Sequence, residues 1–167
     1  MQENVKGVAI SLEGKNAIVT GGGGGMGRCT ALMLAAAGAN LVVSDVNAET
    51  AEATAREAIE KYGVKAVATK CNVTVKSEVD AMVELSVKTL GRIDILNHVA
   101  GVFGAVDFMK STEADYDKQM DINAKGTYFV DQAVLRIMIP NRAGKIVNMC
   151  SQAGKYGFHT NVAYTAS

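Results

Sequence analysis

The sequence predicts an α/β fold with a doubly wound parallel sheet in a single domain, and two observations support that prediction. Short runs rich in β-branched residues alternate with longer segments of helical periodicity along the whole chain. The short runs are also apolar enough to be covered on both faces, as parallel strands are, and single-helix crossovers between them wind the sheet right-handedly. The predicted strands are residues 16–20, 40–44, 65–70, 93–99 and 145–149.

The helices predicted between these strands are marked by apolar spacing and by the residues at their ends. Ala51, Ala55 and Ile59 recur on one face of the second helix. Asn47 stands where an N-cap belongs, and a glycine follows each of the first three helical runs where a left-handed C-cap would lie.

The longest predicted helix covers residues 112–139 and ends at Pro140. Asn123 and Gly126 lie inside it, and because both are poor helix formers we expect the helix to weaken or bend there. It carries more apolar side chains than one face of a sheet needs to cover, which favours a homo-oligomer, a tetramer or a dimer.

Composition limits the classes of partner. The 167 residues are 49% hydrophobic, and 17 basic residues balance 17 acidic ones, so the chain lacks the basic surface that nucleic acid or an anionic membrane requires. A small-molecule partner is therefore expected. Three separated cysteines and two histidines give neither a disulfide framework nor metal-ligand spacing, which favours a cytoplasmic protein without a metal.

No targeting or membrane segment is expected either. Residues 1–15 lack the apolar stretch of a secretory signal. The most apolar stretch, residues 31–43, is shorter than the ~20 residues that a membrane span requires.

A glycine-rich turn follows the first predicted strand and opens the first helix. Residues 20–27 read TGGGGGMG. In such a turn, glycine lets main-chain N–H groups and a helix N-terminus approach the pyrophosphate of a dinucleotide. The turn lacks the Lys-Ser/Thr pair of a nucleoside triphosphate loop. It therefore predicts a dinucleotide site in a Rossmann fold, the alternative being a flexible turn without a ligand.

The second predicted strand leads into Asp45, twenty residues after Gly25. A carboxylate at that point can accept hydrogen bonds from the adenosine ribose and repels a 2′-phosphate. The glycine turn offers no Lys or Arg to bind such a phosphate, so NAD is favoured over NADP. The alternative role of Asp45 is to cap the helix that follows.

Further residues, in order and spacing, make the sequence resemble the short-chain dehydrogenase/reductase family over residues 12–167. They are the 20–27 pattern, Asp45, Asn72-Val73-Thr74, Ala100-Gly101, Asn123, Ser151 and Tyr164. The resemblance implies that NAD is bound by Gly21, Gly25, Met26, Gly27, Asp45, Asn72, Val73, Ala100 and Gly101.

The same resemblance implies a catalytic set of Asn123, Ser151 and Tyr164. Hydride transfer to a ketone leaves an alkoxide, which needs a proton and hydrogen-bond donors. In the family, Tyr164 would exchange the proton, Ser151 would hold the substrate oxygen and Asn123 would support a water relay. Taken singly, each residue also has a purely structural alternative: a turn, a half-buried aromatic or a helix bend.

Two departures from the family pattern stand out. His98 and Val99 occupy positions where the family usually has two asparagines, and we expect His98 to be a structural histidine with satisfied hydrogen bonds. Asn72 replaces the usual acid at the adenine edge, and its side chain keeps an acceptor oxygen and adds a donor.

The family's active-site lysine would follow Ser167 directly. We therefore expect a longer natural protein whose further strands and substrate segment follow this chain. Its expected activity is hydride transfer between NAD(H) and a small secondary alcohol or ketone, with residues 104–110 and 152–160, Phe158 in particular, lining part of the pocket. The alternative is a dinucleotide-binding module without turnover.

Overall fold

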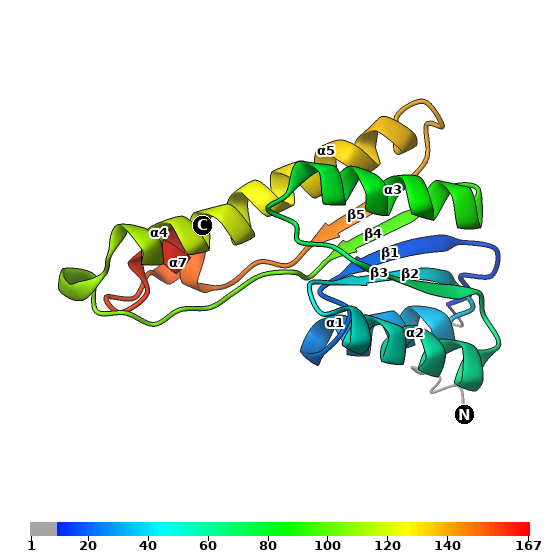
Figure 1. The fold of residues 1–167 in the computed structure, drawn as a ribbon, viewed down its shortest axis with the longest axis horizontal. Coiled ribbons are helices and arrows are strands. Elements are labelled where there is room, and N and C mark those ends of the chain that lie inside the picture. Colours follow the sequence, from blue (N-terminus) through cyan, green and yellow to red (C-terminus); the bar gives the residue numbers. More distant parts are fainter. Residues whose placement is uncertain (1–9) are drawn as a thin grey trace.

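A five-stranded parallel sheet forms the centre of the structure, a computed structural model that describes residues 10–167 (Figure 1). The strand order is β3-β2-β1-β4-β5, which confirms the predicted doubly wound α/β fold. Residues 1–9, which belong to the 1–15 segment that lacks the apolar stretch of a secretory signal, lie outside the described residues. The strands are β1 (Asn16–Thr20), β2 (Asn40–Asp45), β3 (Ala66–Lys70), β4 (Ile95–His98) and β5 (Lys145–Asn148).

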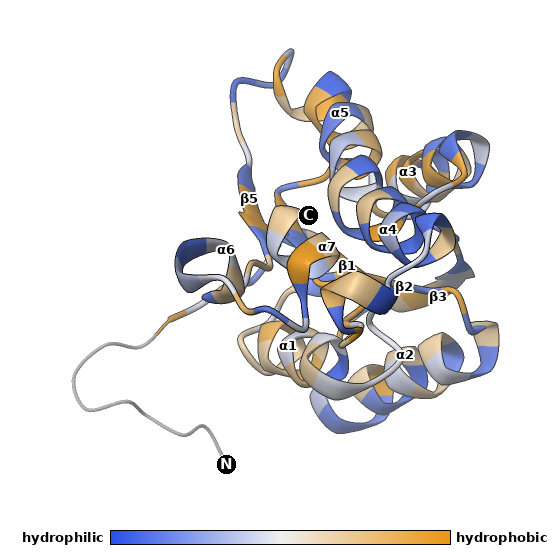
Figure 2. Cartoon of the chain, turned by 90° about the vertical axis from the view of Figure 1, so that its left-hand side faces the viewer, coloured by the Kyte–Doolittle hydropathy of each residue, from blue (hydrophilic) through white to orange (hydrophobic). Residues whose placement is uncertain are grey.

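Helices cover both faces of the sheet, as Figures 1 and 2 show from two directions. On one face lie α1 (Gly25–Ala36) and α2 (Ala48–Tyr62); on the other lie α3 (Lys76–Leu90) and α5 (Gly126–Met138). The chain winds outward from β1 to β3 and then returns to place β4 on the other side of β1. This reversal between β1 and β4 creates the crevice in which open α/β sheets bind ligands.

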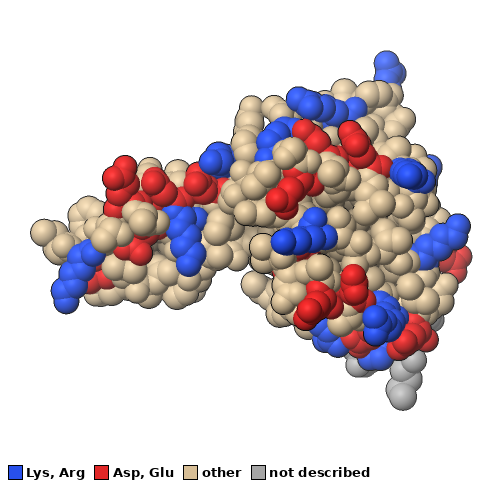
Figure 3. Space-filling model, viewed as in Figure 1, with Lys and Arg blue, Asp and Glu red and all other residues tan. Residues whose placement is uncertain are grey.

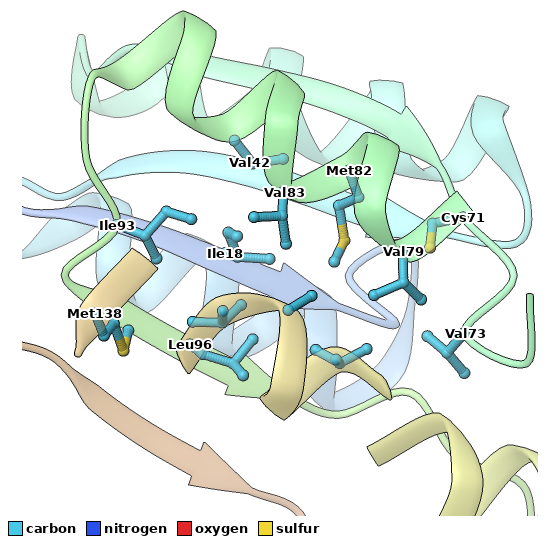
Figure 4. Packing of buried hydrophobic residues seen from close by; sticks show 13 residues of the cluster. Ile18, Val42, Cys71, Val73, Val79, Met82, Val83, Ile93, Leu96 and Met138 are labelled. Carbon is cyan, nitrogen blue, oxygen red and sulfur yellow. The ribbon is translucent and has the colours of Figure 1, made fainter. Parts of the chain in front are cut away.

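Alternation along the central strands divides the core into two layers. Ile18 and Val42 point into a cluster with residues of α3 and α5 (Figure 4), whereas Val19 and Leu41 point into a cluster with α1 and α2. Both layers are built around buried side chains, and partly buried apolar side chains pack against each of them. Because both faces of these strands are covered, their sequences read as continuous apolar runs rather than as an alternation.

The helix ends follow the predicted residues. The side chain of Asn47 accepts hydrogen bonds from the backbone N–H groups of Glu49 and Thr50, at 3.0 and 3.4 Å, and so caps α2. At the other end of α2, Gly63 adopts the left-handed conformation with φ 69°.

The predicted helix over residues 112–139 is divided into three segments. It consists of α4 (Glu113–Gln119), a π-helical segment η2 (Met120–Lys125) and α5. The π-helical segment contains Asn123 and gives way to α5 at Gly126, so the regular α-helix is altered where these two poor helix formers predict a weakening. A Cβ on Gly126 would lie 2.7 Å from Cγ2 of Val73, so glycine allows the helix to pack against the segment after β3.

Beyond the carboxyl ends of the strands, a group of short helices projects from the sheet (Figures 1 and 3). It contains α4, η1 (Phe108–Lys110), α6 (Ala153–Tyr156) and α7 (Val162–Ala166). Basic and acidic residues are intermixed over the face that Figure 3 shows. Among residues 10–167, no helix combines the length and the apolar character needed to cross a membrane.

Candidate active site

The residues expected to bind the cofactor lie at one edge of the sheet. Because β1 to β4 are parallel, their carboxyl ends meet at this edge. The structure therefore brings together segments that are far apart in the sequence. Gly21, Gly25, Met26 and Gly27 follow β1, Asp45 ends β2, Asn72 and Val73 follow β3, and Ala100 and Gly101 follow β4.

Two glycines allow the main chain to pack tightly at the centre of this edge. A Cβ on Gly27 would lie 2.0 Å from the carbonyl oxygen of Gly21. Gly21 itself has φ 63°, and a Cβ there would lie 2.8 Å from the backbone nitrogen of Ala100. The turn after β1, the start of α1 and the end of β4 are thus in backbone contact, which no larger residue would permit.

The amino end of α1 can receive an anion. Within residues 10–167 no side chain caps this end by a hydrogen bond, its first turn holds no acidic residue, and Met26 is exposed. The first N–H groups of a helix have no partner inside the helix, and the helix dipole adds positive potential. The pyrophosphate of a dinucleotide fits this cradle of glycine backbone and helix end.

Asp45 links the glycine turn to the end of β2. Its Oδ2 accepts a hydrogen bond from the backbone N–H of Gly23 at 2.9 Å, and its Oδ1 accepts one from the N–H of Asn47 at 3.0 Å. Each carboxylate oxygen can accept a further hydrogen bond, so ribose hydroxyls remain possible partners. The helix cap is supplied by Asn47, and Asp45 supports the turn into that cap.

Asn72 shapes the segment after β3. Its Oδ1 accepts hydrogen bonds from the backbone N–H and the hydroxyl of Thr74, at 3.0 and 2.9 Å. Its backbone N–H donates to Oε2 of Glu78 at 2.7 Å. The acceptor oxygen is therefore used within the turn, and Nδ2 is the remaining hydrogen-bonding group of the side chain. Sequence reasoning missed Glu78, whose contact depends on the turn between β3 and α3.

Thr20 connects β1 to the residues after β4. Its Oγ1 accepts hydrogen bonds from the backbone N–H groups of Val99 and Ala100, at 3.2 and 3.3 Å, and lies 2.7 Å from Nδ1 of His98. Thr20 was expected only as the first residue of the glycine pattern. Its position there, at the end of a central strand, was the available signal for this role.

Asn123 ties the π-helical segment to the chain that leaves β4. Its Oδ1 accepts from the backbone N–H of Val102 at 2.8 Å, and its Nδ2 donates to the carbonyl oxygen of the same residue at 3.0 Å. Nδ2 also lies 3.0 Å from the hydroxyl of Ser167, just after α7. The structure thereby brings Asn123 to the end of the helix that carries Tyr164.

Tyr164 and Ser151 lie in neighbouring segments of the projecting group. The Tyr164 ring packs edge-on against Phe103, with ring centroids 5.0 Å apart and an interplanar angle of 87°. Ser151 lies between β5 and α6, where its Oγ accepts from the backbone N–H of Ala153 at 3.2 Å. Helices α6 and α7 pack against each other, and α7 also packs against α4 and η2. Phe103 was not anticipated, because nothing local marks it as the partner of Tyr164.

A cavity of about 240 Å³ lies beside α7. Both expected pocket segments contribute to its lining: residues 104–110 supply Gly104, Ala105, Val106 and Phe108, and residues 152–160 supply Thr160 but not Phe158. The remaining lining residues are polar or charged, apart from two apolar residues of α7: Ser111, Asp115, Lys118, Gln119, Asn161, Val162 and Ala163. The mixed lining suits a small organic molecule with polar substituents.

Comparison with known proteins decides the family. A family model described as "short chain dehydrogenase" matches residues 15–167, which is nearly the whole chain. The chain belongs to the short-chain dehydrogenase family. The resemblance drawn from the glycine turn, Asp45 and the later motif residues is confirmed.

Two curated relatives illustrate the range of the family. The chain is 38% identical over 158 residues to 5-keto-D-gluconate 5-reductase of Escherichia coli (strain K12), covering 95% of this chain and 62% of the relative. It is 40% identical over 149 residues to sorbitol dehydrogenase of Cereibacter sphaeroides, covering 89% of this chain and 57% of the relative. The chain thus spans about three fifths of the length of these short-chain dehydrogenases.

Solved structures of the family have the same architecture. An NAD⁺-bound xylitol dehydrogenase superposes with a TM-score of 0.89 at 35% identity, covering 92% of this chain and 59% of that chain. A 7α-hydroxysteroid dehydrogenase in complex with NADH and 7-oxo glycochenodeoxycholic acid gives a TM-score of 0.89 at 33% identity, covering 95% and 61%. The dinucleotide cradle described above fits the cofactor class of these short-chain dehydrogenases.

Substitution of the turn glycines tests the backbone contact. Gly27→Ala places a methyl group against the Gly21 carbonyl, so we expect loss of at least ~3 kcal/mol of stability or failure to fold. Gly24→Ala is the matched control, because a Cβ at Gly24 meets nothing within 4 Å and its φ of −160° suits any residue. Thermal melts of both variants measure the difference. Equal melting temperatures would contradict the close approach.

Proposed function

We propose that the protein is an oxidoreductase that transfers a hydride between NAD(H) and the secondary alcohol or ketone of a small organic substrate. The observation that carries the proposal is the arrangement around Asp45: a carboxylate at the end of β2, bonded to the glycine turn and close to the amino end of α1. Membership of the short-chain dehydrogenase family and the family-specific residues Asn123, Ser151 and Tyr164 add the catalytic part of the proposal.

NAD is the proposed cofactor. It would be held by the turn residues Gly21, Gly25, Met26 and Gly27, by Asp45 at the ribose, and by Asn72, Val73, Ala100 and Gly101 along the edge. When bound, NAD(H) supplies or accepts the hydride. A carboxylate at the ribose disfavours the 2′-phosphate of NADP, and the glycine turn contains no cation to offset that repulsion.

The chain's own residues would manage the proton and the substrate oxygen. The Tyr164 hydroxyl would donate a proton to the oxygen of a ketone, or accept one from an alcohol. The Ser151 hydroxyl would donate a hydrogen bond to the same oxygen and stabilise its developing negative charge. Phe103 restricts the Tyr164 ring, and Asn123 fixes the Val102 backbone and the end of α7, so both limit the motion of the reacting hydroxyl.

The proposed substrates are small alcohols or ketones with polar groups. The cavity beside α7 offers both apolar and hydrogen-bonding side chains next to the helix that carries Tyr164, and neither Tyr164 nor Ser151 lines it. The two relatives described above are named for reactions on a keto sugar acid and a sugar alcohol, which supports this class.

The protein is also proposed to act as a homo-oligomer. The outer face of α5 and the turn after it expose apolar side chains around a shallow groove. Tyr128 and Ile139 are more than 60% exposed there, and the groove is also lined by Leu135, Pro140, Asp131, Gln132 and Arg136. Burying this face in a second copy would remove it from water.

A charge placed on the outer face of α5 tests the proposed homo-oligomer. Leu135→Asp should lower the sedimentation coefficient to that of a monomer at micromolar concentration, since a carboxylate cannot be buried there without a partner. Met33→Asp is the control, because Met33 is 73% exposed on α1, away from this face. An unmodified protein that sediments as a monomer would contradict the proposal.

Asp45→Asn tests the proposed cofactor preference. Removal of the negative charge should lower the ratio of NADH affinity to NADPH affinity about tenfold, which is a change of ~1.4 kcal/mol in the difference between the two binding free energies. Titration of both cofactors by their fluorescence measures the ratio. Glu52→Gln on the exposed side of α2 removes the same charge elsewhere and should leave the ratio unchanged. Equal affinity of the unmodified protein for the two cofactors would refute the preference.

Tyr164→Phe tests the proton-transfer role. It keeps the ring against Phe103 but removes the transferable proton, so kcat should fall by roughly 10²–10⁴ while NADH affinity is retained. The control Tyr116→Phe alters a half-exposed tyrosine of α4 and should leave kcat unchanged. Near-normal kcat in Tyr164→Phe would contradict the assignment. NADH binding without turnover of any alcohol or ketone would favour the non-catalytic module.

A further inference from the structure

His98 is a buried titratable residue that the proposed mechanism does not use. It ends β4, beside Thr20 of β1 and Asn148 of β5, and only 2% of its surface is exposed. It therefore lies directly before the Val99–Gly101 segment at the cofactor edge. The expected satisfied structural histidine is found only in part, because one of its two ring nitrogens has a hydrogen-bond partner within residues 10–167 and the other does not.

The hydrogen bonds of Thr20 determine which ring nitrogen carries the proton. The Thr20 hydroxyl oxygen accepts from the N–H groups of Val99 and Ala100, so its two lone pairs are used. Its hydrogen is left to donate to Nδ1 of His98, 2.7 Å away. Nδ1 must then be unprotonated, and the ring is neutral with its proton on Nε2.

The other ring nitrogen, Nε2, differs from Nδ1 in its hydrogen bonding. Nε2 of His98 and Oδ1 of Asp131 are both buried without a hydrogen-bond partner among the described residues. Oδ2 of Asp131 accepts from Nδ2 of Asn148 at 2.7 Å, which links α5 to β5. Burial lowers the pKa of His98, and the Asp131 carboxylate on α5 opposes that shift more weakly. The nearest residues of β1 and β5, Thr20 and Asn148, are uncharged.

We propose that neutral His98 is a positioning residue for the cofactor edge: it accepts the Thr20 hydroxyl hydrogen and so holds Thr20 as the acceptor for Val99 and Ala100. A proton on Nδ1 would point at an oxygen whose lone pairs are already in use. The Thr20 contacts to Val99 and Ala100 would then weaken, and with them the close approach of Ala100 to Gly21. The consequence for NADH rests on the proposed function, whereas the hydrogen-bond arrangement does not.

The proposal has a pH dependence whose sign follows from the lowered pKa. As the pH falls below about 6.5, the unfolded chain binds a proton at His98 before the folded chain does. The stability that neutral His98 provides is therefore fully present above that pH and is lost below it. The folding equilibrium constant falls by up to about tenfold per pH unit. The loss stops once the folded protein also protonates His98.

The direct test is the ¹⁵N spectrum of the imidazole rings in the unmodified protein at pH 7.5. The expected result is a neutral His98 ring with Nε2 protonated and Nδ1 an acceptor. A charged ring, or a neutral ring protonated at Nδ1, would overturn the proposal. This readout requires neither cofactor nor turnover, so it stays decisive if the protein fails to bind NADH and the proposed function is wrong.

Two substitutions separate the hydrogen bond from packing. His98→Asn can still accept from Thr20 through its side-chain oxygen, whereas His98→Leu fills the site without an acceptor. We expect His98→Leu to shift the amide resonances of Val99 and Ala100 and to weaken NADH binding about tenfold, while His98→Asn stays within threefold of the unmodified protein. Equal effects of the two substitutions would overturn the positioning role.

The loss of folding stability at acid pH is tested with a second histidine as its control. Denaturant melts between pH 5 and 8 should show the loss below pH 6.5 in the unmodified protein and in His159→Asn, which alters an exposed histidine. His98→Asn should lack that part of the loss. An unchanged slope in His98→Asn would overturn the pH dependence.

Discussion

The backbone contact between the turn after β1 and the end of β4 determines the geometry of the whole cofactor edge. Gly27 packs on the Gly21 carbonyl, and Gly21 packs on the Ala100 nitrogen, at distances that exclude a Cβ. This contact sets where α1 begins and therefore where its unpaired N–H groups point. It also fixes the segment from Ala100 to Val102, on which Asn123 and the end of α7 depend.

Side chains at this edge hold the backbone in place as well as facing a ligand. Asp45 accepts from the N–H of Gly23, Thr20 accepts from Val99 and Ala100, and Asn123 pairs with both backbone groups of Val102. Each of these buried or half-buried hydrogen bonds contributes about 1 kcal/mol to stability. A substitution at any of them alters the shape of the site and its chemistry together, so folding and binding must be measured on the same variant.

Local sequence patterns predicted most of the fold, because the apolar periodicity of each strand and helix and the residues at the helix ends lie within the element itself. The five strands were anticipated to within about two residues at each end, and Asn123 and Gly126 marked the break in the long helix. The π-helical form of that break was not predicted. Gly126 packs against Val73 there and Asn123 bonds to Val102, and both contacts join segments distant in the sequence, which local patterns do not encode.

The candidate site divides in the same way. The glycine turn and Asp45 could be singled out from motif spacing, and the proposed catalytic residues from the resemblance to the family. The partners of those residues could not, because Glu78 reaches Asn72 and Phe103 reaches Tyr164 only after the chain folds. His98 was expected to be a satisfied structural histidine, and only its tertiary surroundings reveal that, among residues 10–167, one ring nitrogen is bonded to Thr20 and the other has no partner.

Mapping NADH binding onto backbone amide resonances shows directly whether the carboxyl edge of the sheet binds a nicotinamide dinucleotide. We expect the largest shifts on addition of NADH at the 21–27 turn, Asp45, the Asn72-Val73 segment and the Ala100-Gly101 segment. Resonances of the outer face of α5 should stay unchanged and serve as the internal control. Shifts concentrated away from this edge, or no shifts at millimolar NADH, would show that the dinucleotide does not bind there.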